Sequence, residues 1–291
     1  MNKSALKYKS LFCFGWICAF IILLPFFLQS ALAQKEFVPL ATQLSQASSV
    51  YVTSLNEVYI TETGKHRLLK LDITGQRLDS LGDQGLGNYY FDSPLVVDAT
   101  NGLKIYVVDY NNRRIQMFDR RFQYLSTIEQ PPRSMNQSSY QPMLLAVNNL
   151  GELFFYDSKV QGIIKYNELG NFDMNLGNPG GRIYSPPAAL TTLDNNLLVA
   201  DSVQSVIHVL TNMGQYRKFW STPEKPISIA AAGKNLWILG RSNIFELGAK
   251  GEIIQTIALE EGIKAVDLDV FNRMLYVLTP DKLYRYSLRG D

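Results

Sequence analysis

A sixfold repeat dominates this sequence. An apolar run, a polar turn and a second apolar run recur six times, with 39 to 48 residues between successive copies. The first runs centre on Tyr59, Tyr106, Phe154, Leu198, Trp237 and Tyr276. A period of roughly 40 to 50 residues with several strands in each unit is typical of a β-propeller. The alternative, a sandwich of unrelated strands, would not keep the paired runs in step six times.

A second apolar pair follows each first run after a turn of variable length. The pair begins nine residues after the central residue in the first three units and seven or eight residues after it in the last three. Such variation belongs to loops rather than strands. Glycines beyond the pair, among them Gly75, Gly170 and Gly251, suit hairpin turns with positive φ. Each unit therefore predicts four antiparallel strands, lettered a to d from the hub outwards.

Strands a and b differ in composition as their positions require. Strand b is almost wholly apolar, which fits a strand that neighbouring strands and blades cover on both faces. Strand a is shorter and has smaller side chains, which fits a narrow hub. Its six copies are predicted at 50–53, 95–99, 144–147, 188–191, 227–230 and 264–268.

The ring is expected to close with a strand from the opposite end of the chain. The sixth unit has only three strands before Asp291, and an open sheet edge invites aggregation. The segment 36–44 is unassigned and contains Phe37, Val38 and Leu40, which suit a strand. We therefore predict an all-β fold over residues 34–291, a six-bladed β-propeller of four-stranded antiparallel blades. Segment 36–44 would pair with 283–288 and complete blade six as its outer strand.

Residues 1–33 have the pattern of an export signal. Three lysines precede an apolar stretch at 11–28, and Ala31 and Ala33 form an A-x-A cleavage site before Gln34. The apolar stretch is close to the length that spans a bilayer, so an uncleaved membrane anchor remains an alternative. We predict an exported domain that is periplasmic, on the cell surface or secreted. Membrane contact is expected only through 11–28 if the leader is retained.

Cysteine content and net charge argue against several kinds of site and partner. Both cysteines, Cys13 and Cys18, lie in the leader, so the exported domain has no disulfide, cysteine zinc ligand or cysteine nucleophile. The chain carries 28 Lys and Arg against 26 Asp and Glu, and three of the lysines lie in the leader, which leaves a net charge of −1. A near-neutral domain has no global electrostatic reason to bind nucleic acid.

Blade two and the loop before it carry enough detail to suggest a family. The informative residues are Gly82, Phe91, Pro94, Val97, Asp98, Ile105, Tyr106, Val107, Asp109, Asn112, Arg114, Ile115 and Phe118. This order resembles the NHL repeat, with its Gly-rich loop followed by F-x-x-P, V-x-D, I-Y-V-x-D and N-x-R-I-x-x-F. The resemblance implies a six-bladed propeller of the type also found in TolB-like domains. Function does not follow, since such propellers include binding platforms, RNA binders, lactone hydrolases and lyases.

Asp109, Asn112 and Arg114 form the most site-like polar group in the sequence. By the same resemblance, they correspond to residues that pin the turn between strands b and c. An aspartate can accept hydrogen bonds from turn amides and from a guanidinium, and asparagine tolerates the left-handed conformation. We therefore predict that these three residues are a structural turn network rather than a catalytic group.

Few residues of this sequence suit a catalytic site. The two histidines, His66 and His208, are predicted on third strands of different blades and at the surface, which argues against a zinc site. A lactonase-like site would need oxygen ligands for calcium at the channel mouth. The candidates are Asp98, Asn148, Asp267 and Asp269. They sit at inconsistent offsets, and no inner strand carries a glutamate as general base, so a calcium-dependent hydrolase is kept as the alternative function.

Long loops on one face favour a binding function. Loops that join strand d to the next strand a emerge on the face conventionally called the top, and they are long at 82–94, 130–142 and 177–187. They carry Tyr89, Tyr90, Arg133, Tyr140, Arg182 and Tyr184. Tyrosine and arginine are enriched at recognition hot spots, although these rings could instead pack onto the blades. We predict a non-catalytic binding or scaffold domain for a protein, peptide or glycan, with no cofactor.

Overall fold

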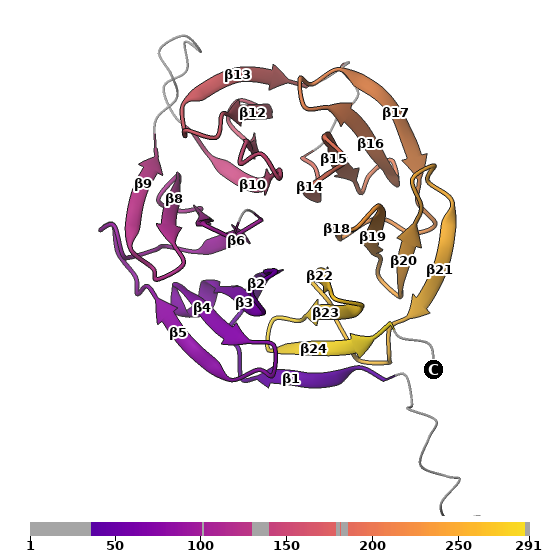
Figure 1. The fold of residues 1–291 in the computed structure, drawn as a ribbon, viewed down its shortest axis with the longest axis horizontal. Helices are drawn as coiled ribbons and strands as arrows, with labels where there is room; N and C mark the ends of the chain where they lie inside the picture. The colour runs from indigo at the N-terminus through magenta and orange to yellow at the C-terminus, as the bar shows by residue number, and fades with distance from the viewer. Residues whose placement is uncertain (1–35, 101, 130–139, 179–180, 182–185, 289–291) are drawn as a thin grey trace, which may run out of the picture. The chain divides into compact units, whose positions relative to one another are not determined.

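The computed structural model describes residues 36–100, 102–129, 140–178, 181 and 186–288. In this part of the chain, 24 strands form six four-stranded antiparallel sheets arranged as blades around a central channel (Figure 1). The predicted six-bladed propeller is therefore confirmed. The element η1 (Thr63–Lys65) is a short 3-10 turn in blade one. Among the described residues, no helix has the length and apolar character needed to cross a membrane.

The strands follow the chain blade by blade, from the hub outwards. Blade one comprises β2 (Ala47–Val52), β3 (Glu57–Glu62), β4 (Arg67–Asp72) and β5 (Arg77–Leu81). Blade two comprises β6 (Pro94–Asp98), β7 (Lys104–Asp109), β8 (Arg114–Asp119) and β9 (Tyr124–Ile128). Blade three comprises β10 (Pro142–Val147), β11 (Leu153–Asp157), β12 (Gly162–Tyr166) and β13 (Phe172–Gly177). Blade four comprises β14 (Ala189–Leu193), β15 (Asn196–Asp201), β16 (Val206–Thr211) and β17 (Tyr216–Ser221). Blade five comprises β18 (Ser228–Ala232), β19 (Asn235–Leu239), β20 (Asn243–Leu247) and β21 (Ile253–Ala258). Blade six comprises β22 (Asp267–Phe271), β23 (Met274–Leu278), β24 (Lys282–Ser287) and β1 (Val38–Thr42).

The N-terminal strand closes the ring as predicted. β1 pairs antiparallel with β24 from Val38 opposite Arg285 to Thr42 opposite Lys282, and Figure 1 shows β1 along the outside of β24. Phe37, just before β1, is buried with its ring centroid 4.8 Å from that of Tyr286. Blade six therefore contains strands from both ends of the described chain.

The apolar core lies between the blades. Six clusters of buried side chains occur among the described residues, and each combines residues from two adjacent blades. The second strands, such as β3 and β11, are buried along their whole length because a blade lies on each side. Strand composition thus follows radial position, as the sequence predicted.

The innermost strand of blade six differs from its prediction. It was expected at 264–268, but β22 covers Asp267–Phe271. The two-residue turn at Asn272 and Arg273 has positive φ at both positions, 49° and 60°, which is the geometry of a tight hairpin. A turn of this kind fixes the register of the strands that flank it, so β22 must extend up to residue 271.

Candidate functional site

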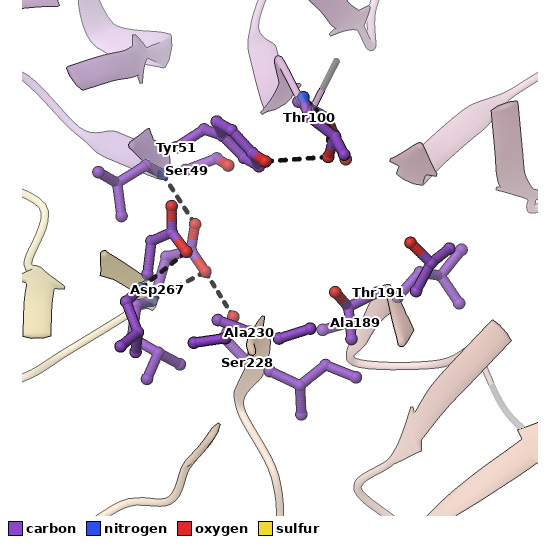
Figure 2. Close-up of a pocket in the computed structure, with 18 of the residues that line it drawn as sticks. Ser49, Tyr51, Thr100, Ala189, Thr191, Ser228, Ala230 and Asp267 are labelled. Atoms are coloured by element: carbon purple, nitrogen blue, oxygen red, sulfur yellow. Dashed lines mark hydrogen bonds between the residues drawn. The ribbon is translucent and has the colours of Figure 1, made fainter. Parts of the chain in front are cut away.

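A cavity occupies the central channel of the propeller. It has a volume of 820 Å³ and is lined by the innermost strands of all six blades. Figure 2 shows Tyr51, Thr100 and Asp267 on one side of this cavity, and the small side chains Ala189 and Thr191 lie apart from them. The channel is therefore polar and acidic where blades six, one and two meet.

Two channel carboxylates link blade six to blade one. Asp267 accepts a hydrogen bond from the Val50 amide at 2.8 Å, and Asp269 accepts one from the Val52 amide at 2.6 Å. The second oxygen of Asp267 accepts from Ser228 Oγ and from the Leu268 amide, while that of Asp269 accepts from the Val270 amide. These aspartates satisfy amides on the inner edge of β2 that the sheet leaves unpaired.

Asp98 links blades two and three in the same way, by accepting a hydrogen bond from a backbone amide. Its Oδ2 accepts from the Val147 amide at 2.9 Å, and its Oδ1 accepts from both the amide and the hydroxyl of Thr100. Thr100 also accepts a hydrogen bond from the Tyr51 hydroxyl at 2.9 Å, which joins blades one and two (Figure 2). Three aspartates thus connect blades around the hub.

These residues, with Asn148, are engaged by other groups of the chain. Both oxygens of each channel aspartate already accept hydrogen bonds, and Asn148 Oδ1 accepts from the amides of Leu150 and Glu152. Among the described residues, no group of three or more His, Cys, Asp or Glu is placed to hold a metal ion. The geometry assigns Asp98, Asp267 and Asp269 a structural role between blades, and Asn148 a role in a turn.

Burial changes the acidity of the channel aspartates. It raises the pKa of Asp98 and of Asp267 to about 6, and the pKa of Asp269 to about 7, while their hydrogen bonds oppose the shift. Nearby Asp267 and Asp98 add to the shift at Asp269 by charge repulsion. The three carboxyls therefore change protonation within an ordinary working range of pH.

Stability is expected to fall as the pH rises from 5 to 8. The pKa values in the folded state lie above those of the unfolded chain, about 4, so the folded state binds more protons in this window. The resulting stabilisation is present at low pH and is lost as the pH rises through 6 to 7. In thermal unfolding against pH, Asp269→Asn should flatten this slope, whereas Asp79→Asn on the exposed strand β5 should not. An unchanged slope in Asp269→Asn would contradict the assignment.

Asp109, Asn112 and Arg114 lie together at the top of blade two. Asp109 Oδ2 accepts from Asn112 Nδ2 and from Arg114 Nε, each at 2.8 Å, and its Oδ1 accepts from the Asp92 amide at 2.7 Å. Asp109 is fully buried and Arg114 is 6% exposed. Burial raises the pKa of Asp109, and the bonds from Asn112 and Arg114 oppose that shift. The three residues thus form one buried, charge-paired unit.

This network, here called the Asp109 network, also holds the loop 82–94. Arg114 donates to the carbonyl oxygens of Leu86 at 2.8 Å and of Gly87 and Tyr90 at 3.0 Å. Asn112 donates to the carbonyl of Gly85 at 2.8 Å. The loop is therefore fixed to the blade through its backbone, which leaves its side chains available to face solvent.

The loop 82–94 exposes three large side chains. Leu86 is 77% exposed, Tyr89 45% and Tyr90 47%. Tyr89 also packs against blade two, with its ring centroid 6.3 Å from that of Tyr124. Leu86 is a candidate that sequence reasoning missed, because a single leucine in a Gly-rich loop gives no pattern. The three residues form an exposed apolar and aromatic group on a rigid support.

The remaining loop candidates do not join this group. Tyr140 is 1% exposed; its hydroxyl is 2.9 Å from that of Tyr166 and its ring packs edge-on against Phe155. The predicted binding role of Tyr140 therefore does not hold, because the ring points into the core between blades two and three. Arg133, Arg182 and Tyr184 lie outside the described residues, as does the leader at 1–33.

The histidines occupy separate places, and one of them corrects a prediction. His208 on β16 is 3% exposed, with Nε2 3.7 Å from Asp201 and Nδ1 3.5 Å from the Tyr216 hydroxyl. The expectation that it lies at the surface is wrong, because third strands are buried almost as fully as second strands. His66 is partly exposed, and its Nδ1 accepts from the Ser93 amide at 3.2 Å.

Comparison with known proteins identifies the fold. No family model matches the chain, and no curated protein matches its sequence. A gluconolactonase from Xanthomonas campestris matches with a TM-score of 0.66 and 15% identity, over 90% of this chain and 92% of that one. A catalytically inactive virginiamycin B lyase from Staphylococcus aureus matches at 0.65 and 12%, over 87% and 99%. A nidogen/laminin complex matches at 0.61 and 15%, over 77% and 84%. Such low identities show the propeller fold and not an activity.

Proposed function

We propose that this propeller is a non-catalytic recognition domain that binds a protein, peptide or glycan through the loop 82–94. The observation that carries the proposal is the exposure of Leu86, Tyr89 and Tyr90 on a backbone fixed by the Asp109 network. A preorganised loop loses little conformational entropy on binding, and exposed tyrosines supply large contact area. These are the properties that a recognition surface needs.

The channel gives less support to a hydrolase. Its aspartates are engaged by backbone amides of neighbouring blades, which gives them a structural role that needs no metal ion. The structural neighbours include a lyase, a gluconolactonase and a nidogen/laminin complex, so the shared fold is compatible with either kind of function. The choice therefore depends on the residues of this chain, which favour binding at the top face.

The family and location of the domain belong to the same proposal. The motifs of blade two support an NHL-like, TolB-like propeller, and the leader at 1–33 supports export to the periplasm, the cell surface or the medium. A recognition domain without cysteines needs no oxidising compartment and folds by strand packing alone.

Replacing Leu86 by Ser and Tyr90 by Ala together is expected to weaken partner binding at least tenfold, because exposed anchor residues dominate binding energy. A photo-crosslinking residue at position 90 of the full-length protein in cells should first yield a discrete adduct, whose sensitivity to protease or glycosidase gives the partner class. The affinity of the double variant for that partner is then measured.

Phe219 provides a matched control. It is 53% exposed on the outer strand β17, so Phe219→Ala removes a comparable aromatic ring elsewhere on the propeller. A crosslinker at position 219 should not yield the adduct, and Phe219→Ala should leave the affinity unchanged. The same adduct from both positions, or equal affinity for the double variant and the parent protein, would refute the proposal.

A further inference from the structure

The face of the propeller opposite the loop 82–94 repeats one kind of turn. Neighbouring strands of a blade are antiparallel, so the turns that join strand a to b and strand c to d all lie on this face, here called the bottom face. Seven five-residue turns among the described residues share two backbone hydrogen bonds, from the fourth amide to the first carbonyl and from the first amide to the fifth carbonyl. They are 53–57, 72–76, 119–123, 148–152, 167–171, 211–215 and 248–252.

Side-chain hydrogen bonds fix most of these turns. In six of the seven, the first residue is Thr, Asp or Asn, and its side-chain oxygen accepts from the amides of the third and fifth residues. Side chains of this kind stabilise turns by replacing a backbone partner. The third residue is therefore held in the same place each time, and it is exposed in all seven turns.

The third position of these turns carries few types of side chain. It is aliphatic in four turns, where Leu55 is 47% exposed, Leu150 63%, Leu169 74% and Met213 53%. It is basic in two others, at Arg121 and Lys250, and it is Thr74 in the last. Turns favour glycine and small polar residues, so the turn itself does not require an aliphatic side chain at an exposed third position. Exposed apolar side chains that gather on one face indicate a surface that binds something.

Contacts between blades show that these turns are neighbours. A Cβ atom added to Gly102 would lie 3.9 Å from Leu55 Cδ1, so the a–b turns of blades one and two are adjacent. The next residue, Leu103, is 75% exposed. Lys104 Nζ donates to the Glu168 carbonyl at 3.0 Å, which joins the same turn to the c–d turn of blade three. Exposed aliphatic side chains thus continue from blade one to blade three.

Basic side chains accompany the aliphatic ones on the bottom face. The exposed cations are Arg121, Lys234, Lys250 and Arg273. Exposed acids also occur in or beside the turns, at Glu168, Asp194 and Glu252. None of these acids occupies the third position of the seven described turns, and Glu252 accepts from the Lys250 amide within its own turn. The third positions therefore present aliphatic and positively charged groups to a partner.

We propose that the bottom face binds the surface of a membrane that contains anionic lipids. Peripheral proteins bind such a surface through apolar side chains that enter the headgroup layer and basic side chains that attract anionic headgroups. Polar residues such as Asn149 and Glu168 separate the aliphatic ones, so they do not form the continuous apolar centre of a protein interface. A fluid lipid layer accommodates separate side chains. This inference is independent of the proposed recognition at the loop 82–94, which would face away from the membrane.

The test measures amide hydrogen exchange of the full-length protein with vesicles of phosphatidylcholine, alone or mixed with phosphatidylglycerol. The mixed vesicles should slow exchange in the turns 53–57, 148–152, 167–171 and 211–215, and should leave the amides at 85–90 on the opposite face unchanged. Exchange is followed turn by turn because residues 11–28 could hold the protein on vesicles without any contact of the bottom face. Phosphatidylcholine alone should slow exchange less, since it has no net negative charge.

Two variants test the apolar and the basic part of this surface. Leu150→Ser combined with Leu169→Ser should shift the equilibrium between free and membrane-bound turns at least tenfold toward the free form, because two apolar side chains no longer leave water. The shift is read from exchange at 211–215. Arg121→Gln should shift the same equilibrium about fivefold on the mixed vesicles and not on phosphatidylcholine alone, since one attraction to anionic lipid is lost.

Val203→Ser is the matched control. Val203 is 68% exposed and its amide donates to Asp201 Oδ1, so a similar turn presents it, but it lies between strands b and c of blade four, on the opposite face. This variant should leave exchange at 211–215 unchanged. The proposal is wrong if mixed vesicles do not slow exchange in the bottom turns, or if Val203→Ser weakens binding as much as the leucine double variant does. Exchange that slows with protein concentration without vesicles would assign the surface to a second copy of this chain, and would equally overturn the proposal.

Discussion

Deleting residues 36–44 is expected to leave the protein unfolded or aggregated at room temperature. This segment contributes all of β1 and the buried side chains of Phe37 and Leu44. It also joins three blades. The Phe37 amide donates to Glu260 beyond blade five, the Leu44 amide donates to the carbonyl of Asp281 in blade six, and the Leu44 side chain packs in one cluster with Val50 of blade one. Burial of a Phe and a Leu is worth about 3–6 kcal/mol, which is a large part of the whole stability of a domain.

Two point variants test whether the buried side chains of this segment, and not only its backbone pairing, stabilise the domain. Phe37→Ala should lower the free energy of unfolding by about 3–5 kcal/mol, which for a domain of this size is a fall in Tm of about 10 °C. Val38→Ala, at the neighbouring residue that is 45% exposed, should change it by less than about 0.5 kcal/mol. Equal Tm values for the two variants would show that the N-terminal strand does not hold the ring closed.

The fold could be predicted from the sequence because propeller blades repeat one pattern. Each second strand is buried on both faces, so its apolar run is unbroken, and six such runs at similar spacing leave few alternatives. Closure by β1 followed from a count of strands against the need to cover an edge. The starts of β2 and β22 were each misplaced by three residues. In β22 the tight turn at Asn272 and Arg273, and not composition, sets the register.

The residues that bind each loop to its blade were less predictable than the fold, because different blades use different residues for this contact. In blades one, two and three the carboxylate that ends strand b accepts a hydrogen bond from an amide of the preceding loop. Glu62 accepts from Ser45, Asp109 from Asp92 and Asp157 from Gln141. Blade five has Gly240 at this position. There Glu224 of the preceding loop accepts from the Ser242 amide, so the acid and the amide have exchanged sides.

The exposed fraction of individual loop side chains could not be predicted from the sequence. Tyr89 and Tyr140 both lie in long loops before strand a, yet Tyr89 is 45% exposed and Tyr140 is 1% exposed. The difference depends on the path of each loop, and loop paths carry no periodic signal. His208 was misjudged for a related reason, since its neighbours Asp201 and Tyr216 come from other strands of the same blade.

Asp109→Ala is expected to be the most damaging single substitution on the top face. It removes the partner of Arg114, a cation that is 6% exposed, and leaves that charge buried. Breaking a buried ion pair from one side typically costs about 3–5 kcal/mol. The loss should appear as a fall in Tm of about 10 °C, and the amides at 85–90 should exchange with deuterium faster because Arg114 no longer holds their carbonyls in place.

Asp157→Ala in blade three is the matched control for this prediction. Asp157 occupies the equivalent repeat position and is also fully buried, but it accepts from the backbone amides of Gln141, Lys159 and Val160. Gly162 stands where blade two has Arg114, so no arginine is orphaned and the expected cost is about 1–3 kcal/mol. If both alanine variants lost equal stability, the turn amides and not the ion pair would account for the effect. The loop 82–94 would then be rigid for reasons other than Arg114, and its exchange rates in Asp109→Ala would decide between the two explanations.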